Sequence, residues 1–125
     1  MVSNETEPKK SSETTLHVSN FDRIVSGEVA ANILFQDEKV IVIKEEAHPV
    51  APNHFLVIPK NRDGLTGISK AESRHKPLIG HMMQIGSKVA KSEGMDKNGY
   101  RMVVNEGKHG CGLENHFHLQ FIGGK

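Results

Sequence analysis

The chain is poor in residues that build disulfide-rich or aromatic-rich folds: its 125 residues include one cysteine and no tryptophan. Cys111 has no second cysteine with which to form an internal disulfide, so stability must come from a packed core. A lone thiol also suits a reducing compartment. The expected location is the cytoplasm, with the nucleus as an alternative.

The net charge is small, and long hydrophobic runs are missing. The formal net charge is only +1, and no cluster of Lys and Arg is long enough to form a basic arm. No stretch approaches the roughly 20 apolar residues that span a bilayer, and the N-terminus lacks the apolar segment of a secretory signal. These features argue against nucleic acid or a membrane as a partner. Any phosphate group must therefore be bound by local contacts.

The length suffices for one hydrophobic core but not for two. The first 15 residues are rich in Ser, Thr, Glu and Lys and offer almost nothing to bury. They therefore cannot offset the entropy cost of becoming ordered. We expect residues 1–19 to form a flexible tail and residues 20–125 to form a single domain.

The pattern of apolar residues predicts regular elements from Phe21 onward. Apolar residues at helical spacing between Phe21 and Val25, with Gly27 as a stop, predict a short helix. Two β-branched or aromatic runs at 33–35 and 40–43 flank a polar turn and predict a hairpin.

The later part of the chain predicts three more strands and a long helix. The apolar run 54–58 is closed by a proline, which cannot donate to a strand ladder. An apolar stripe at helical spacing runs from Pro77 to Gly94. Strands are expected at 100–104 and 116–122. The order of elements indicates an α+β fold: a five-stranded, mainly antiparallel sheet with one long helix and a short N-terminal helix.

The six residues from His116 to Phe121 alternate strictly between polar and apolar. On a strand, this alternation places His116, His118 and Gln120 on one face and the three apolar residues on the other. Two imidazoles and an amide form a row of hydrogen-bonding and nucleophilic groups next to a glycine-rich loop, residues 107–112. Such a row suits a phosphate group.

Two other interpretations of this row are open. A single histidine on a half-buried sheet is often a polar residue that faces water, although a pair beside such a loop is more often functional. The His-x-His spacing can also chelate Zn²⁺, with His54, His109 or Cys111 as a third ligand. Gln120 argues against zinc because an amide is a poor ligand for this ion.

Several segments together resemble the histidine triad family. The segment 105–107, the glycine-rich loop and the segment 116–124 match a signature in which three histidines alternate with apolar residues. The segments 51–60 and 100–107 are similar, almost residue for residue, to the nucleoside phosphoramidase branch, the Hint-type proteins. The similarity extends over about residues 21–124.

The resemblance implies a homodimer whose sheets join through the strand near residues 100–105, with a purine nucleotide in each protomer. It also implies hydrolysis of nucleoside phosphoramidates or related nucleotidyl compounds without a metal or other cofactor. The nucleophile of the family corresponds to His118, and His116 supports its orientation. His54 matches a fourth family histidine that lies behind the first.

The same resemblance implies contacts to the nucleotide. Asn105 matches an asparagine that contacts the phosphate. Glu45 or Glu46 lies where the family has an acidic residue that holds the ribose hydroxyls.

The chemistry of these residue types agrees with that assignment. Attack by the neutral imidazole of His118 on an α-phosphate gives a nucleotidyl-histidine, which water then cleaves. The ring must present one nitrogen to phosphorus, so the other should donate to a backbone carbonyl. Backbone N–H groups of Gly110, Cys111 and Gly112 are expected to meet the charge on the phosphate oxygens, so no cation is required.

Two positions depart from the phosphoramidase pattern. Gln120 replaces the third histidine, which keeps a hydrogen-bond donor but removes a group that can carry a proton. Leu113 replaces a serine that helps to bind the phosphate and protonate the leaving group. Losing one such donor commonly costs on the order of 10²-fold in rate.

These departures leave two alternatives to an active hydrolase. The first is a nucleotide-binding or interaction protein whose catalytic activity is weakened. The second is a protein with nucleotidyltransferase-like activity. The second alternative arises because His-x-His-x-Gln also resembles the motif of galactose-1-phosphate uridylyltransferases.

Overall fold

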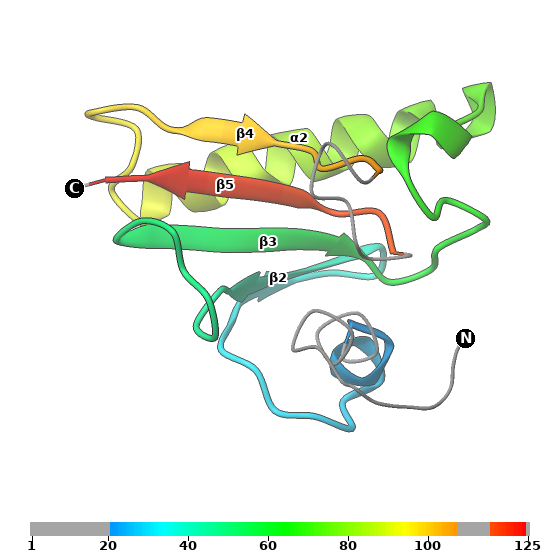
Figure 1. The fold of residues 1–125 in the computed structure, drawn as a ribbon, viewed down its shortest axis with the longest axis horizontal. Coiled ribbons are helices and arrows are strands. Elements are labelled where there is room, and N and C mark those ends of the chain that lie inside the picture. Colours follow the sequence, from blue (N-terminus) through cyan, green and yellow to red (C-terminus); the bar gives the residue numbers. More distant parts are fainter. Residues whose placement is uncertain (1–20, 108–115, 125) are drawn as a thin grey trace.

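A computed structural model describes residues 21–107 and 116–124 of the chain. Its sheet has the strand order β1-β2-β3-β5-β4, and every neighbouring pair is antiparallel (Figure 1). The strands are β1 (Ile33–Gln36), β2 (Val40–Lys44), β3 (Asn53–Pro59), β4 (Arg101–Val103) and β5 (Leu119–Gly123). The predicted α+β class is confirmed. The expected tail, residues 1–19, lies outside the described residues.

The predicted short helix and hairpin both form. Residues 21–26 are helical, and Gly27 follows with φ +84°, a conformation that favours glycine. In the turn between β1 and β2, Asp37 Oδ1 accepts the N–H groups of Lys39 and Val40, each at 2.8 Å. This side-chain hydrogen bonding is the reason why an aspartate favours a turn here.

The long helix, α2 (Lys76–Ser92), crosses one face of the sheet (Figure 1). Pro77 lies in its first turn, where a missing N–H costs nothing. A Cβ atom at Gly86 would lie 2.2 Å from Cζ of Phe121, so glycine is required for this close approach of α2 to β5. In the described part of the chain, no helix has the length and apolar character needed to cross a membrane.

Two short 3₁₀ helices precede α2 in a segment whose composition indicates only a loop. They are η1 (Ile68–Lys70) and η2 (Ser73–His75). In η2, the N–H of Glu72 donates to Nδ1 of His75, and the ring Nε2 of His75 lies 2.9 Å from the carbonyl oxygen of Asp63. His75 is therefore a buried structural residue.

The two faces of the sheet carry separate apolar cores. On the α2 side, the strand residues of the core are Val40, Val42, Phe55, Val57, Leu119 and Phe121. On the opposite side, Phe21 packs with Ile41, Ile43, Leu56 and Ile58. The histidine row belongs to this second face, because the ring of Phe21 contacts those of His116 and His118.

β5 begins at Leu119, which corrects the predicted range 116–122, and β4 is one residue shorter at each end than predicted. The backbone before Leu119 bonds outside the sheet: the N–H of Phe117 donates to the carbonyl of Leu65 at 3.2 Å. The carbonyl of His116 accepts a hydrogen bond from a side chain. Phe117 still belongs to the core on the α2 side, so the predicted alternation of faces is confirmed.

Candidate functional site

The ring of His118 has a defined orientation. Its Nδ1 lies 2.9 Å from the backbone oxygen of His116, and the side chain is buried. Because a carbonyl can only accept, Nδ1 carries the proton and Nε2 carries the lone pair. The hydrogen bond that we expected from the ring of His118 to a backbone carbonyl is therefore present.

Gln120 stands between His118 and a third histidine. Its Oε1 lies 2.8 Å from Nε2 of His54, and its Nε2 lies 3.5 Å from Nε2 of His118. The N–H of Val50 donates to Nδ1 of His54 at 3.2 Å, so the proton of His54 is on Nε2 and points at the amide oxygen. The amide of Gln120 is thereby oriented with its NH₂ group toward His118.

His54 therefore lies against Gln120 and not behind His116, which corrects the position implied by the resemblance. The register of the sheet explains this contact. Leu56 on β3 lies opposite Gln120 on β5. His54 is two residues from Leu56 and on the same face, so it is a diagonal neighbour of Gln120.

His116 is held from a different direction. Its Nε2 lies 2.9 Å from the carbonyl oxygen of Pro59, and its Nδ1 lies 3.4 Å from Oδ1 of Asp22. Burial lowers the pKa of His116 below its ordinary value, although the Pro59 carbonyl and the Asp22 carboxylate both raise it. The ring is therefore neutral near pH 7, with its proton on Nε2.

Three further residues complete this region, and no sequence pattern points to two of them. Phe21 makes edge-on contacts with His118 and His116, at ring-centroid distances of 4.9 and 5.7 Å. Asp22 forms an ion pair with Arg62. Phe21 is visible in the sequence as part of an apolar stripe, but Asp22 and Arg62 are 40 residues apart and follow no motif.

The two acidic candidates for the ribose lie at a shallow cavity on the histidine face. Glu45, Glu46 and Ile24 are among the residues that line it, and its volume is about 160 Å³. The carboxylate of Glu45 already accepts the N–H groups of Ala47 and His48. Glu46 is exposed, and its carboxylate accepts a long hydrogen bond from Asn32 at 3.5 Å. Glu46 is therefore the more accessible of the two.

Asn105 follows β4 and is half-buried. Its neighbour Glu106 accepts hydrogen bonds from the hydroxyl and the N–H of Ser69, at 2.9 and 3.3 Å. The hydroxyl of Ser69 is the main reason why the pKa of Glu106 is lowered. These bonds fix the chain just before the glycine-rich loop. The predicted phosphate contacts Gly110, Cys111 and Gly112, together with Leu113, lie outside the described residues.

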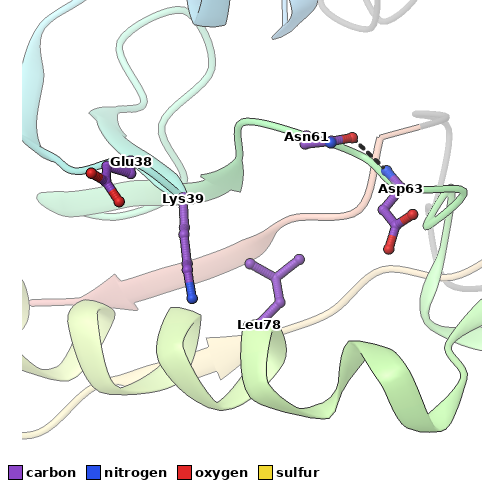
Figure 2. Close-up of a pocket in the computed structure, with 5 residues that line it drawn as sticks. All are labelled: Glu38, Lys39, Asn61, Asp63 and Leu78. Atoms are coloured by element: carbon purple, nitrogen blue, oxygen red, sulfur yellow. Dashed lines mark hydrogen bonds between the residues drawn. The ribbon is translucent and has the colours of Figure 1, made fainter.

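A second hollow, with a volume of about 210 Å³, lies between the β1–β2 turn, the segment after β3 and α2 (Figure 2). Leu78 and Lys39 project into the space between these elements, and the N–H of Asp63 donates to Asn61. Leu78 packs against the core on the α2 side of the sheet. None of the predicted site residues lines this hollow, so it is separate from the histidine row.

The antiparallel sheet, the long helix across it and the His-x-His-x-Gln row define a class of small α+β domains with paired histidines. A family model described as "scavenger mRNA decapping enzyme C-term binding" matches residues 19–125. This chain is similar to the solved structure of a HIT family hydrolase from Legionella pneumophila, with a TM-score of 0.78 and 30% sequence identity. The aligned region covers 84% of this chain and 91% of the hydrolase chain. The chain belongs to the histidine triad family.

Named relatives support the Hint-type branch. A protein from Arabidopsis thaliana called adenylylsulfatase HINT1 is 44% identical over 105 residues, which are 84% of this chain and 70% of that protein. A 14 kDa zinc-binding protein from Zea mays is 42% identical over 105 residues, which are 84% of this chain and 80% of the relative.

Zinc does not fit the histidines whose positions are described. Within residues 21–107 and 116–124, no group of three or more His, Cys, Asp or Glu side chains could hold a metal ion. One ring nitrogen of His116 and one of His118 are already bonded to backbone carbonyls. His109 and Cys111 lie outside the described residues.

Proposed function

We propose that this chain is a nucleoside phosphoramidase-type hydrolase that cleaves purine nucleoside phosphoramidates or related nucleotidyl compounds through a nucleotidyl intermediate on His118. One observation carries the proposal. Nδ1 of His118 donates to the carbonyl of His116 at 2.9 Å, so the ring carries its lone pair on Nε2, the atom that attacks phosphorus in the proposed reaction.

The reaction then proceeds in two displacements. Nε2 of His118 bonds to the α-phosphorus while the bond from phosphorus to the leaving amine breaks, and the amine takes a proton from solvent. A water molecule next attacks phosphorus, the bond to Nε2 breaks, and the nucleotide and a proton are released. The NH₂ group of Gln120 donates to a phosphate oxygen in both steps, while His54 keeps the amide in that orientation.

We assign the nucleoside to a position on the same face. The cavity beside Ile24 offers an apolar wall for a base and the carboxylate of Glu46 for the ribose hydroxyls. Asn105 and the loop with Gly110, Cys111 and Gly112 are assigned to the phosphate by the resemblance to the family.

The direct test is turnover of a panel of adenosine and guanosine phosphoramidates by the full chain. We expect hydrolysis that a chelator does not inhibit, because the resemblance to the family implies a reaction without a metal. After rapid quenching, mass spectrometry should find the nucleotidyl group on the peptide that contains His118. An adduct on another residue, or no hydrolysis of any substrate, would contradict the proposal.

A second candidate function is a nucleotide-binding module with little or no turnover, and Gln120 is the observation that favours it. An amide cannot carry the proton that a histidine carries at this position. Calorimetry that detects AMP or GMP binding, with no hydrolysis of the panel, would support this function. Transfer of the nucleotidyl group to a hydroxyl acceptor other than water would instead support the transferase-like alternative.

We also propose that the chain forms a homodimer through β4. This strand lies at one edge of the sheet, and an open edge tends to pair with another strand. Met102 and Val104 beside this edge are 41% and 39% exposed, and Met83 on α2 is 43% exposed. Light scattering should give twice the monomer mass for the wild type and the monomer mass for Met102→Asp. A monomeric wild type would contradict this assembly.

A further inference from the structure

Two consecutive residues of the N-terminal helix, Phe21 and Asp22, lie against the first two histidines of the row. Phe21 is fully buried, and its ring lies nearly perpendicular to the rings of His118 and His116 and in contact with both. Asp22 places one carboxylate oxygen 3.4 Å from Nδ1 of His116. The helix that spans residues 21–26 is thus positioned against the histidine row.

Arg62 fixes this short helix to the rest of the domain. Its guanidinium pairs with the other carboxylate oxygen of Asp22 and is the main reason why the pKa of Asp22 is lowered. Arg62 follows β3 by three residues, close to Pro59, whose carbonyl bonds to the ring of His116. The ion pair therefore connects the two segments that hold this ring.

When the ring of His116 is neutral, its Nδ1 atom has no hydrogen-bond donor beside it in the described part of the chain. Nδ1 is buried and has no hydrogen-bond partner within the described residues, because the nearby oxygen of Asp22 is also an acceptor. Only a protonated His116 can donate to Asp22 and to Pro59 together. The carboxylate is thus placed to restrain the neutral ring by packing and to bond to the charged ring directly.

We propose that Asp22 is a positioning residue for the histidine row: held by Arg62, it fixes the ring of His116 and keeps Phe21 packed on His118. The effect reaches the nucleophile because the backbone carbonyl of His116 holds Nδ1 of His118. This inference rests on the proposed function for its consequence in catalysis. Its structural part, the restraint on the two rings, can be measured without turnover.

The charged groups that act on His116 in the described part of the chain make opposite contributions. The carboxylate of Asp22 raises the pKa of His116, whereas the guanidinium of Arg62 lowers it. Removing the negative charge of Asp22 should therefore move the titration of His116 to lower pH. Removing the positive charge of Arg62 should move it to higher pH.

The test compares Asp22→Asn, Asp22→Ala and Arg62→Met with a matched control, Asp63→Asn. Asp63 forms a similar exposed ion pair with Arg74: the side chains are 55% and 53% exposed, against 63% and 32% for Asp22 and Arg62. It takes no part in the hydrogen bonds of the His116 ring. Asparagine also tolerates the positive φ of Asp63, +49°.

We expect Asp22→Ala to lower the rate of nucleotidyl transfer by about tenfold, because small displacements of a nucleophile are costly. Affinity for AMP should change by less than about twofold, since the change acts on the chemical step. Histidine NMR should show the His116 titration displaced in opposite directions in Asp22→Asn and Arg62→Met. Exchange of the Nδ1 proton of His118 with water should be faster in Asp22→Ala, and Asp63→Asn should change none of these quantities.

The outcomes separate this inference from the proposed function. If the wild type has no turnover, the hydrolase proposal fails, and the NMR measurements alone decide the role of Asp22. If the wild type is active but Asp22→Ala retains its full rate and its Nδ1 exchange, the positioning role is wrong. An equal loss of rate in Asp63→Asn would also overturn it, because any surface ion pair would then have the same effect.

Discussion

His118→Ala is expected to abolish nucleotidyl transfer, with a loss of at least about 10³-fold in kcat/KM. The substitution removes the only atom that forms the covalent bond to phosphorus in the proposed mechanism. The other two rings are held differently: Nε2 of His116 is bonded to Pro59 and its Nδ1 lies 3.4 Å from a carboxylate oxygen of Asp22, while both nitrogens of His54 are hydrogen-bonded. The measurement is single-turnover hydrolysis of a nucleoside phosphoramidate.

Two controls make this result specific. Affinity for AMP, measured by calorimetry, should persist in His118→Ala because the contacts that we propose for the base and the ribose lie at the separate cavity lined by Glu46. The thermal unfolding midpoint should change little. A variant that keeps its affinity and also keeps more than a tenth of the wild-type rate would show that His118 is not the nucleophile.

The double substitution Gln120→His and Leu113→Ser is expected to raise turnover, by on the order of 10²-fold if the missing serine limits the rate. The serine supplies a donor to the phosphate and a proton for the leaving group. A histidine at position 120 can accept the proton of His54 Nε2 with one ring nitrogen and donate with the other. The row would then regain a group that can carry a charge.

The single variants divide this gain between the two positions. Gln120→His should also alter the dependence of kcat/KM on pH, because glutamine does not ionise and histidine does. With Gln120 in place, we expect a single acid limb as the nucleophilic imidazole becomes protonated. An unchanged rate in the double variant would mean that neither departure from the family pattern limits catalysis.

The predictions from local sequence patterns are confirmed where local physics decides the structure. The alternation from His116 to Phe121 fixes which side chains share a face, because successive residues of an extended chain point in opposite directions. The apolar stripe predicts α2, because helical spacing brings its members to one side. Asp37 predicts the hairpin turn, because its side chain bonds to the backbone within three residues.

The local sequence pattern did not predict where β5 begins. The alternation continues through His116 and His118, but this segment does not extend the ladder. The ring of His116 bonds to Pro59, the N–H of Phe117 donates to Leu65, and the ring of His118 bonds to the carbonyl of His116. A period of two in the sequence records the faces of an extended segment. It does not record where the pairing with the neighbouring strand ends: β3 continues to Pro59, but its last pair with β5 joins Val57 to Leu119.

Taken alone, the sequence determined the fold class, the face that carries the histidines and the identity of the candidate nucleophile. Only the tertiary structure decided which groups hold those histidines. It placed His54 against Gln120 through the register of β3 and β5, and it brought Asp22 and Arg62 together beside His116. Such contacts join segments that are distant along the chain, so they depend on strand register and packing and leave no local pattern to read.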